Sequence, residues 1–170
     1  MAIAGLKLTE GLSIRPATAN DRPFLEQLHH STRPDLQLIN DEQEFIDSVI
    51  EMQFHAQSSG YGSQFPNAMY FIVEKQQTRI GKVSVDFGPN EVRVIDIAFI
   101  PQARNKGFGE SVLRALQQAS TQVATPLVLT VDSNNLSAKR LYLRLGFVSE
   151  SIDPPYELMT WYPTEQRLFI

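Results

Sequence analysis

The sequence predicts a mixed α+β fold in a single domain. Apolar residues recur at the period of helices in some segments and alternate at the period of strands in others, and the two kinds of segment are interspersed along the chain. A chain of 170 residues is long enough to bury one substantial core and short for two. We therefore expect one domain over residues 1–170, with its core between about 10 and 162.

The first part of the chain predicts one strand and two helices. Residues 12–15 alternate between apolar and polar and are followed by proline, which is typical of a short strand. Asn20 is suited to cap a helix with apolar residues at Phe24, Leu25 and Leu28. A second helical stripe follows over residues 40–54, and residues 58–66 are rich in serine, glycine and glutamine, which predicts a loop.

The middle of the chain predicts an antiparallel meander. Three runs rich in β-branched and aromatic residues are separated by short turn sequences: residues 70–73, 80–87 and 92–100. The third run is apolar on both faces and ends at Pro101, which marks a central strand covered on each side.

The last third predicts a helix, a strand, a second helix and a closing strand pair. The first helix presents one apolar face made by Val112, Leu113, Leu116 and Ala119. A short β-rich run at 127–131 follows. The second helix runs from about Leu136 to Leu145, with Asn134 or Asn135 as N-cap and Gly146 at its end. The strand pair is predicted at residues 147–151 and 156–161.

Composition excludes several kinds of site. The chain has no cysteine, so disulfides, thiolate metal sites and a cysteine nucleophile are excluded. Its net charge of −4 argues against general nucleic-acid binding, which needs a dominant basic face. Apolar runs are far shorter than the roughly 20 residues that cross a bilayer, so we expect a cytoplasmic protein without a membrane partner. The histidines 29, 30 and 55 show no metal-ligand spacing with carboxylates, and we expect no metal.

The run from Ile97 to Gly109 carries most of the functional information. A buried strand leads into a glycine-containing turn that opens a helix, and free N–H groups at a helix N-terminus bind anions. Glycines let a diphosphate approach the backbone, and Arg104 and Lys106 add positive charge. A plain strand-to-helix turn can share this pattern. The run is not a Walker loop, because Lys106 precedes Gly107, and it lacks the third glycine of a dinucleotide fingerprint.

Two motifs in order identify a family resemblance. The run Arg-x-x-Gly-x-Gly at residues 104–109 resembles motif A of the GNAT superfamily of acyl-CoA N-acyltransferases. The stretch from Asn135 to Phe147 resembles that family's motif B, Asn-x-x-Ala-x-x-Leu-Tyr-x-x-x-Gly-Phe, at every signature position. The resemblance covers about residues 10–162. It implies a mostly antiparallel central sheet of about six to seven strands with helices on both faces, and a central strand that is splayed and bulged near residues 96–98.

The resemblance also implies the reaction and its site. It implies transfer of an acetyl group from the cosubstrate acetyl-CoA to a primary amine by direct attack, the amine being a small molecule, a protein N-terminus or a lysine. Tyr142 is expected to lie near the sulfur of CoA and to protonate the leaving thiolate, with a packed core tyrosine as the alternative. Asn135 is expected to hydrogen-bond the pantetheine arm or the bulged strand, which is compatible with a cap. The cofactor-binding residues implied are Ile97, Ala98, Phe99, Arg104, Asn105, Lys106, Gly107, Phe108, Gly109, Asn135 and Tyr142.

Asp96 is the second candidate catalytic residue. A carboxylate in an apolar strand must be paired, hydrogen-bonded or neutralised. It would serve as general base if unpaired, whereas pairing with Arg93 or another cation would make it structural. Glu91, Asp86, backbone carbonyls or a water chain are the alternatives for removing the amine's proton. Thr130 stands where some relatives place a glutamate, and Phe99 is bulkier than the residue usual at its position.

The acceptor is expected to meet the N-terminal helices, the loop after them and the last strand pair. The residues that could form this cleft, or could simply be core and surface, are Met52, Gln53, Gln57, Tyr61, Phe65 and Tyr156. A non-catalytic acyl-CoA-binding module or sensor is the alternative function, and it would have no use for Tyr142. A toxin-like acetyltransferase acting on charged tRNA is disfavoured by the acidic charge. A homodimer is the common expectation for a small enzyme.

Overall fold

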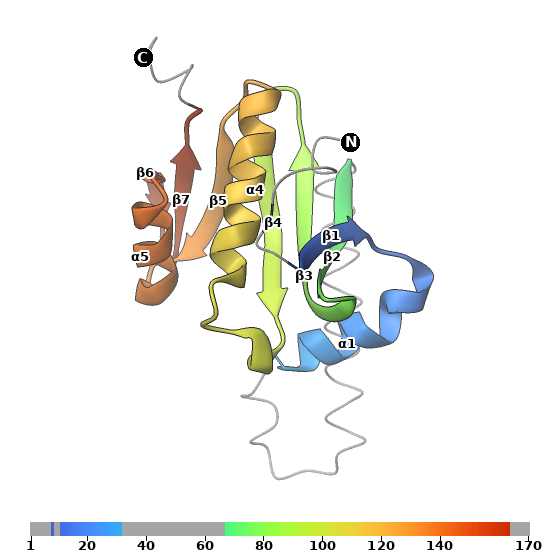
Figure 1. Cartoon of the computed structure of the whole chain (residues 1–170). Coiled ribbons are helices and arrows are strands. Elements are labelled where there is room, and N and C mark those ends of the chain that lie inside the picture. The colour runs from blue at the N-terminus through green and yellow to red at the C-terminus, as the bar shows by residue number, and fades with distance from the viewer. Residues whose placement is uncertain (1–7, 9–10, 32–66, 164–170) are drawn as a thin grey trace.

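The computed structural model describes residues 8, 11–31 and 67–163. With the labels of Figure 1, its strands are β1 (Leu12–Pro16), β2 (Ala68–Lys75), β3 (Thr78–Phe87), β4 (Val92–Phe99), β5 (Leu127–Asp132), β6 (Val148–Asp153) and β7 (Tyr156–Trp161). Its α-helices are α1 (Arg22–Ser31), α4 (Phe108–Gln122) and α5 (Leu136–Arg144), with short 3-10 turns η1 (Ala19–Asp21) and η2 (Pro101–Ala103). The helix predicted at 40–54, the loop at 58–66 and the five cleft residues from Met52 to Phe65 lie outside the described residues.

The strands form one seven-stranded sheet in the order β1-β2-β3-β4-β5-β7-β6. Neighbouring strands are antiparallel except for β4 and β5, which are parallel. The predicted meander is β2-β3-β4, and β4 is the central strand, as its two apolar faces indicated. The predicted α+β class with a mostly antiparallel sheet is confirmed. None of the helices described is long and apolar enough to span a membrane.

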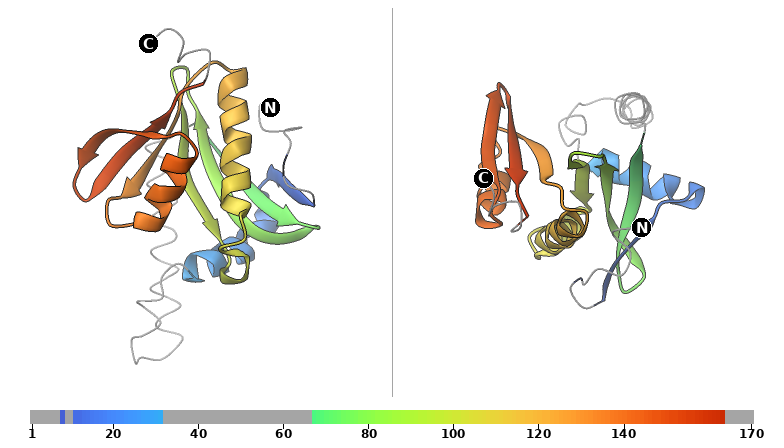
Figure 2. Two further views of the ribbon diagram at one scale, coloured as in Figure 1. Left: turned by 60° about the vertical axis from the view of Figure 1, so that its left-hand side comes forward. Right: turned by 90° about the horizontal axis from the view of Figure 1, so that it is seen from above.

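Helix α4 covers one face of the sheet and buries the predicted apolar stripe. Val112, Leu113 and Leu116 are at most 1% exposed and pack in one core with residues of β3, β4 and β5. Seen along the strands, α4 and α1 lie on opposite sides of the sheet (Figure 2). The burial of these side chains contributes roughly 1.5–3 kcal/mol each, so α4 is fixed firmly against the central strands.

The sheet splits between β4 and β5. Strand β5 pairs with β4 only over Val92–Val94, and beyond that point the two strands separate, with α4 lying over the gap (Figure 1). A bulge marks the place: Val85 pairs with Val94 and Ser84 with Asp96, so Ile95 is an extra residue on β4. The predicted bulge is therefore present and begins one residue earlier than expected, because the register with β3 decides its position.

The start of the first helix differs from the prediction. Asn20 lies inside the 3-10 turn η1, and Thr18 precedes that turn, where its backbone N–H donates to the Asp21 carboxylate at 2.8 Å. Asp21 also accepts from Arg15 at 2.7 Å and from Arg79 at 2.8 Å, and its side chain is fully buried. The pKa of Asp21 is held well below its usual range, and the hydrogen bond from Arg15 is the largest of the causes. This carboxylate ties β1, the turn and β3 together.

Candidate active site

The N-terminus of α4 is built by left-handed residues in the preceding turn. Asn105 has φ of 60° and Gly107, the N-cap, has φ of 84°. This geometry starts the helix abruptly, so the first N–H groups of α4 point out of the helix without intrahelical partners. Such an end attracts anions through its N–H groups and its dipole.

Gly109 leaves space at this helix end. A Cβ built on Gly109 would lie 3.6 Å from Cε2 of Phe99, an ordinary contact, and its φ is not in the left-handed region. Neither packing nor backbone conformation therefore requires a glycine at this position. A glycine is required if a ligand group approaches the backbone there.

Helix α5 supplies the second wall. Of the two candidate caps, Asn135 is the N-cap: its side-chain oxygen accepts from the N–H of Ala138 at 3.2 Å. Gly146 follows the helix with φ of 99°, as predicted for its end. The backbone N–H of Phe147 donates to the carbonyl of Tyr142 at 3.0 Å. These two ends fix the helix and hence the place of Tyr142.

A groove of about 640 Å³ runs between the N-terminus of α4 and α5. Arg144 on its wall donates to Glu110 in the first turn of α4 at 2.6 Å, which links the two helices. Its lining residues come from the end of β4, the turn before α4, and one face of α5: Phe99, Ala103, Arg104, Asn105, Gly107, Phe108, Gly109, Glu110, Asn135, Ser137, Ala138, Arg140, Leu141 and Arg144. The N-terminus of α4 and the side chains of Arg104 and Arg140 thus line one groove, together with the paired Arg144 and Glu110.

A second cavity of about 480 Å³ lies along the edge of β4 that β5 leaves free. It is lined by Ser31, Ile97, Ala98, Phe99, Arg104, Gly109, Leu113, Leu141 and Tyr142. Four residues line both spaces, namely Phe99, Arg104, Gly109 and Leu141. The groove and the cavity are therefore adjacent, and a long ligand could lie in the groove with one end in the cavity.

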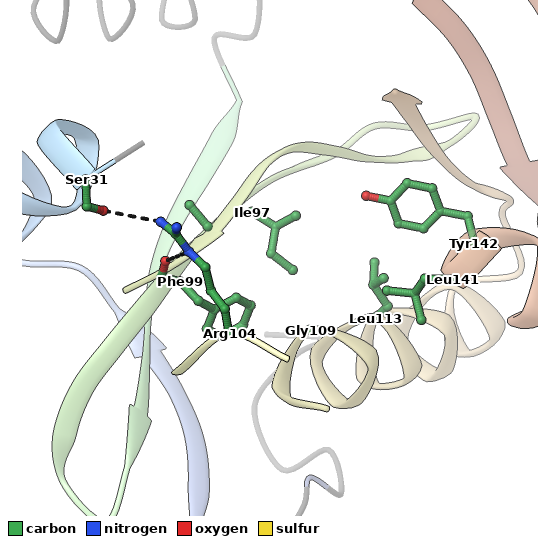
Figure 3. Close-up of a pocket in the computed structure, with 9 residues that line it drawn as sticks. Ser31, Ile97, Phe99, Arg104, Gly109, Leu113, Leu141 and Tyr142 are labelled. Atoms are coloured by element: carbon green, nitrogen blue, oxygen red, sulfur yellow. Dashed lines mark hydrogen bonds between the residues drawn. The ribbon is translucent and has the colours of Figure 1, made fainter. Parts of the chain in front are cut away.

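Tyr142 points its hydroxyl into this cavity (Figure 3). Its ring packs at 5.7 Å from that of Phe147, at an angle of 57°. Burial raises the pKa of Tyr142 above its ordinary value. The hydroxyl therefore stays protonated at neutral pH and can donate a proton.

Asp96 is paired rather than free. Its carboxylate lies 2.7 Å from Nζ of Lys82 on β3, and the two side chains are only 22% and 14% exposed. Arg93, the partner suggested by the sequence, lies instead 3.0 Å from Glu91. A cation at this distance stabilises the charged carboxylate, which would be costly to leave unpaired in an apolar strand.

The Phe99 ring is accommodated by a glycine on the neighbouring strand. Gly81 is its cross-strand partner, and a Cβ on Gly81 would come within 2.6 Å of Cδ1 of Phe99. The ring thus occupies the space above Gly81 and still lines both the groove and the cavity. This explains how a bulky residue fits at the end of β4.

The side chain of Arg104 lines both the groove and the cavity, and it hydrogen-bonds to residues outside the N-terminus of α4. Its Nε donates to the carbonyl of Phe99 at 3.0 Å, and one terminal nitrogen donates to Oγ of Ser31 at 3.4 Å. Ser31 ends α1, so this side chain connects the turn before α4 to the first helix (Figure 3).

The structure brings together most of the predicted site residues. All of them line the groove or the cavity except Asp96 and Lys106. The predictions missed Ser31, Leu113 and Leu141 in the cavity, and Ser137, Arg140 and Arg144 in the groove. Residues 137, 140, 141 and 144 recur at the spacing of one helix face. That period in the sequence could have identified this face of α5 as part of the site.

The groove at the N-terminus of α4 joins an apolar cavity along the split of the sheet. A long ligand that carries a diphosphate, such as coenzyme A, would fit a site of this form. The chain matches the model of the acetyltransferase (GNAT) family over residues 25–147. It therefore belongs to that family, as its two motifs indicated.

Individual proteins are similar to this chain in sequence or in fold. An uncharacterized N-acetyltransferase of Methanocaldococcus jannaschii is 29% identical over 101 residues, which are 57% of this chain and 63% of that protein. The chain thus spans about three fifths of that relative's length. The PaiA N-acetyltransferase of Thermoplasma acidophilum, solved with coenzyme A, has a TM-score of 0.67 at 18% identity, over 89% of this chain and 98% of that one. The spermidine N-acetyltransferase of Vibrio cholerae, solved with CoA and spermine, has a TM-score of 0.63 at 21% identity, over 92% and 98%.

Proposed function

We propose that this chain transfers an acetyl group from acetyl-CoA to a primary amine by direct attack. The observation that carries the proposal is the junction of the groove and the cavity. A helix N-terminus with Gly109 beside it is suited to a diphosphate, and the joined cavity holds a protonated tyrosine at the free edge of β4.

The residues that would hold the cosubstrate follow from the lining of the groove. The backbone of Asn105 to Gly109 would bind the diphosphate, with Arg140 as a cation on the opposite wall, where Arg144 is paired with Glu110. Asn135 lines the same groove beside the expected path of the pantetheine arm. The backbones of Ile97, Ala98 and Phe99 would bind that arm and the thioester carbonyl, because β5 leaves this edge of β4 without a paired strand among the described residues. When bound, acetyl-CoA supplies an acetyl group activated as a thioester.

The reaction requires stabilisation of the carbonyl oxygen, a proton for the leaving sulfur and removal of a proton from the amine. A backbone N–H at the free edge of β4 would stabilise negative charge on the carbonyl oxygen as the new C–N bond forms. The hydroxyl of Tyr142 would donate its proton to the sulfur as the C–S bond breaks, and would regain one from solvent. The amine must lose one proton, which we assign to a water chain. Asp96 is the other candidate for this step, but its bond to Lys82 supports a structural role.

The proposal is tested by incubating the protein with acetyl-CoA and a panel of amines and peptides. The panel should contain polyamines, amino acids, aryl amines and peptides with free N-termini or lysines. Release of the CoA thiol and a mass increase of one acetyl group on the same acceptor are the expected result. Tight binding of acetyl-CoA with no transfer to any acceptor would instead favour the non-catalytic acyl-CoA-binding module.

A homodimer is also part of the proposal. Strand β6 ends the sheet, and all six of its residues are exposed. Val148 is 48% and Ile152 is 64% exposed, so this edge strand presents two apolar side chains that a partner strand could cover. Sedimentation analysis of the wild type and of a variant with both residues replaced by threonine tests this. We expect the variant to be monomeric at concentrations where the wild type is a dimer.

A further inference from the structure

We propose that Arg104 is an anchor for an anionic group on the acceptor, so that the favoured acceptors are amines that also carry a carboxylate. This inference rests on the proposed function, since it concerns the second substrate of the same site. It assigns to Arg104 a ligand different from the diphosphate that the motif suggested.

The first support is the direction of the guanidinium. Two hydrogen bonds, to the carbonyl of Phe99 and to Oγ of Ser31, hold it on the α1 side of the cavity. Ser31 is fixed in turn, because its hydroxyl donates to the carbonyl of Leu28 at 2.7 Å. Figure 3 shows Arg104 and Ser31 at one end of the cavity and Tyr142 at the other. The side chain therefore borders the space on the far side of the cavity from the proton donor.

The second support is the number of donors that Arg104 has left. A guanidinium has five N–H donors, and the recorded bonds of Arg104 to described residues use two of them. The side chain is exposed, so the other donors can reach a ligand. The pair of bonds already made fixes the plane of the group, which favours the bidentate recognition of a carboxylate.

The third support is the charge of the cavity. The other described lining residues are apolar or uncharged, and none of them is an acid. The nearest carboxylate on β4, that of Asp96, is paired with Lys82. A cationic tail, such as that of a polyamine, would meet a positive charge here, whereas a carboxylate would meet a fixed cation. Complementary charge of this kind determines specificity.

The fourth support is that the groove offers the diphosphate a cation other than Arg104. Arg140 lines the groove and does not line the cavity, whereas Arg144 in the same groove is paired with Glu110 at 2.6 Å. The helix N-terminus offers its own N–H groups there. The phosphates therefore have donors besides Arg104, which lines both the groove and the cavity.

The test compares acceptor pairs that differ in the carboxylate alone. Suitable pairs are phenylalanine with phenethylamine, methionine with its decarboxylated amine, and 4-aminobutyrate with propylamine. The ratio of kcat/KM within each pair is measured for the wild type, for Arg104→Gln, and for Arg140→Gln as a matched control from the groove. Calorimetry gives the Kd of each protein for CoA, which reports on the cosubstrate independently of turnover.

We expect the wild type to favour the carboxylate-bearing member of at least one pair. Arg104→Gln should lower that preference about tenfold or more, because it removes the charge-assisted bonds. Differences in amine basicity within a pair cancel when the two proteins are compared. Arg140→Gln should weaken CoA binding and leave the acceptor preference unchanged.

Three results would overturn the inference. One is an equal preference in Arg104→Gln and in the wild type. Another is weaker CoA binding in Arg104→Gln without a change in acceptor preference, which would return Arg104 to the diphosphate. The third is a wild-type preference for polyamines over every carboxylate-bearing amine. If the wild type transfers acetyl to no amine at all, the proposed function itself is wrong, and the inference falls with it.

Discussion

Replacing Gly109 with alanine should separate the binding of CoA from the stability of the fold. The new Cβ would lie 3.6 Å from Phe99, so it fits the protein without strain. Alanine in place of glycine in a helix stabilises by roughly 0.5–1 kcal/mol. For a chain of this length that corresponds to a rise in Tm of about 1–4 °C.

The same Cβ should weaken CoA binding. It would stand where a diphosphate oxygen must approach the amides at the start of α4. A hydrogen bond to a charged group contributes about 1.5–3 kcal/mol, so losing one should raise the Kd roughly 10- to 100-fold. The Kd is measured by calorimetry with CoA and Tm by differential scanning calorimetry of the protein alone.

Gly107→Ala is the matched control two residues away. A Cβ on Gly107 would meet no atom within 4 Å, but this residue has φ of 84°. An alanine there costs about 1–2 kcal/mol in the left-handed region, so its Tm should fall. A Gly109→Ala protein that binds CoA as tightly as the wild type would refute the placement of the diphosphate.

Three other substitutions test the remaining parts of the account. Tyr142→Phe should lower kcat about 10- to 100-fold and leave the Kd for CoA unchanged, because only the donated proton is lost; an unchanged kcat would mean that solvent supplies that proton. Asp96→Asn should leave the shape of the pH-rate profile unchanged and lower stability by about 1–3 kcal/mol, because it leaves Lys82 without its ion pair; a profile that loses its acidic limb would make Asp96 the base. Asp21→Asn should remove part of the acid sensitivity of folding. The pKa of Asp21 is lowered in the folded state, so the wild type's stability is lost as pH falls below about 4, and its Tm should decline more steeply below that pH than the variant's does.

Local rules predicted the elements well because the chain is locally consistent. The stripe of Val112, Leu113 and Leu116 gave α4, and the run apolar on both faces gave the central strand. Asn135 and Gly146 marked the ends of α5 because a cap and a left-handed residue have few alternatives. The order of the two motifs gave the family.

The features that sequence reasoning missed depend on contacts between distant segments. The pairing of Asp96 with Lys82 follows from the register of β3 on β4, which local patterns do not specify. The exact position of the predicted bulge, at Ile95 rather than at residues 96–98, has the same origin. Arg104 bonds to Ser31, a residue of the first helix, and no spacing within the motif indicates that contact.

The central claim is that acetyl-CoA lies in the groove with its thioester at the free edge of β4. A crystal structure of the protein with acetyl-CoA tests it most directly. We predict the diphosphate within hydrogen-bond distance of the N–H groups of residues 107–109, and the sulfur close to the hydroxyl of Tyr142. A diphosphate bound elsewhere, or a sulfur out of reach of Tyr142 with the helix end of α4 still open, would contradict the account.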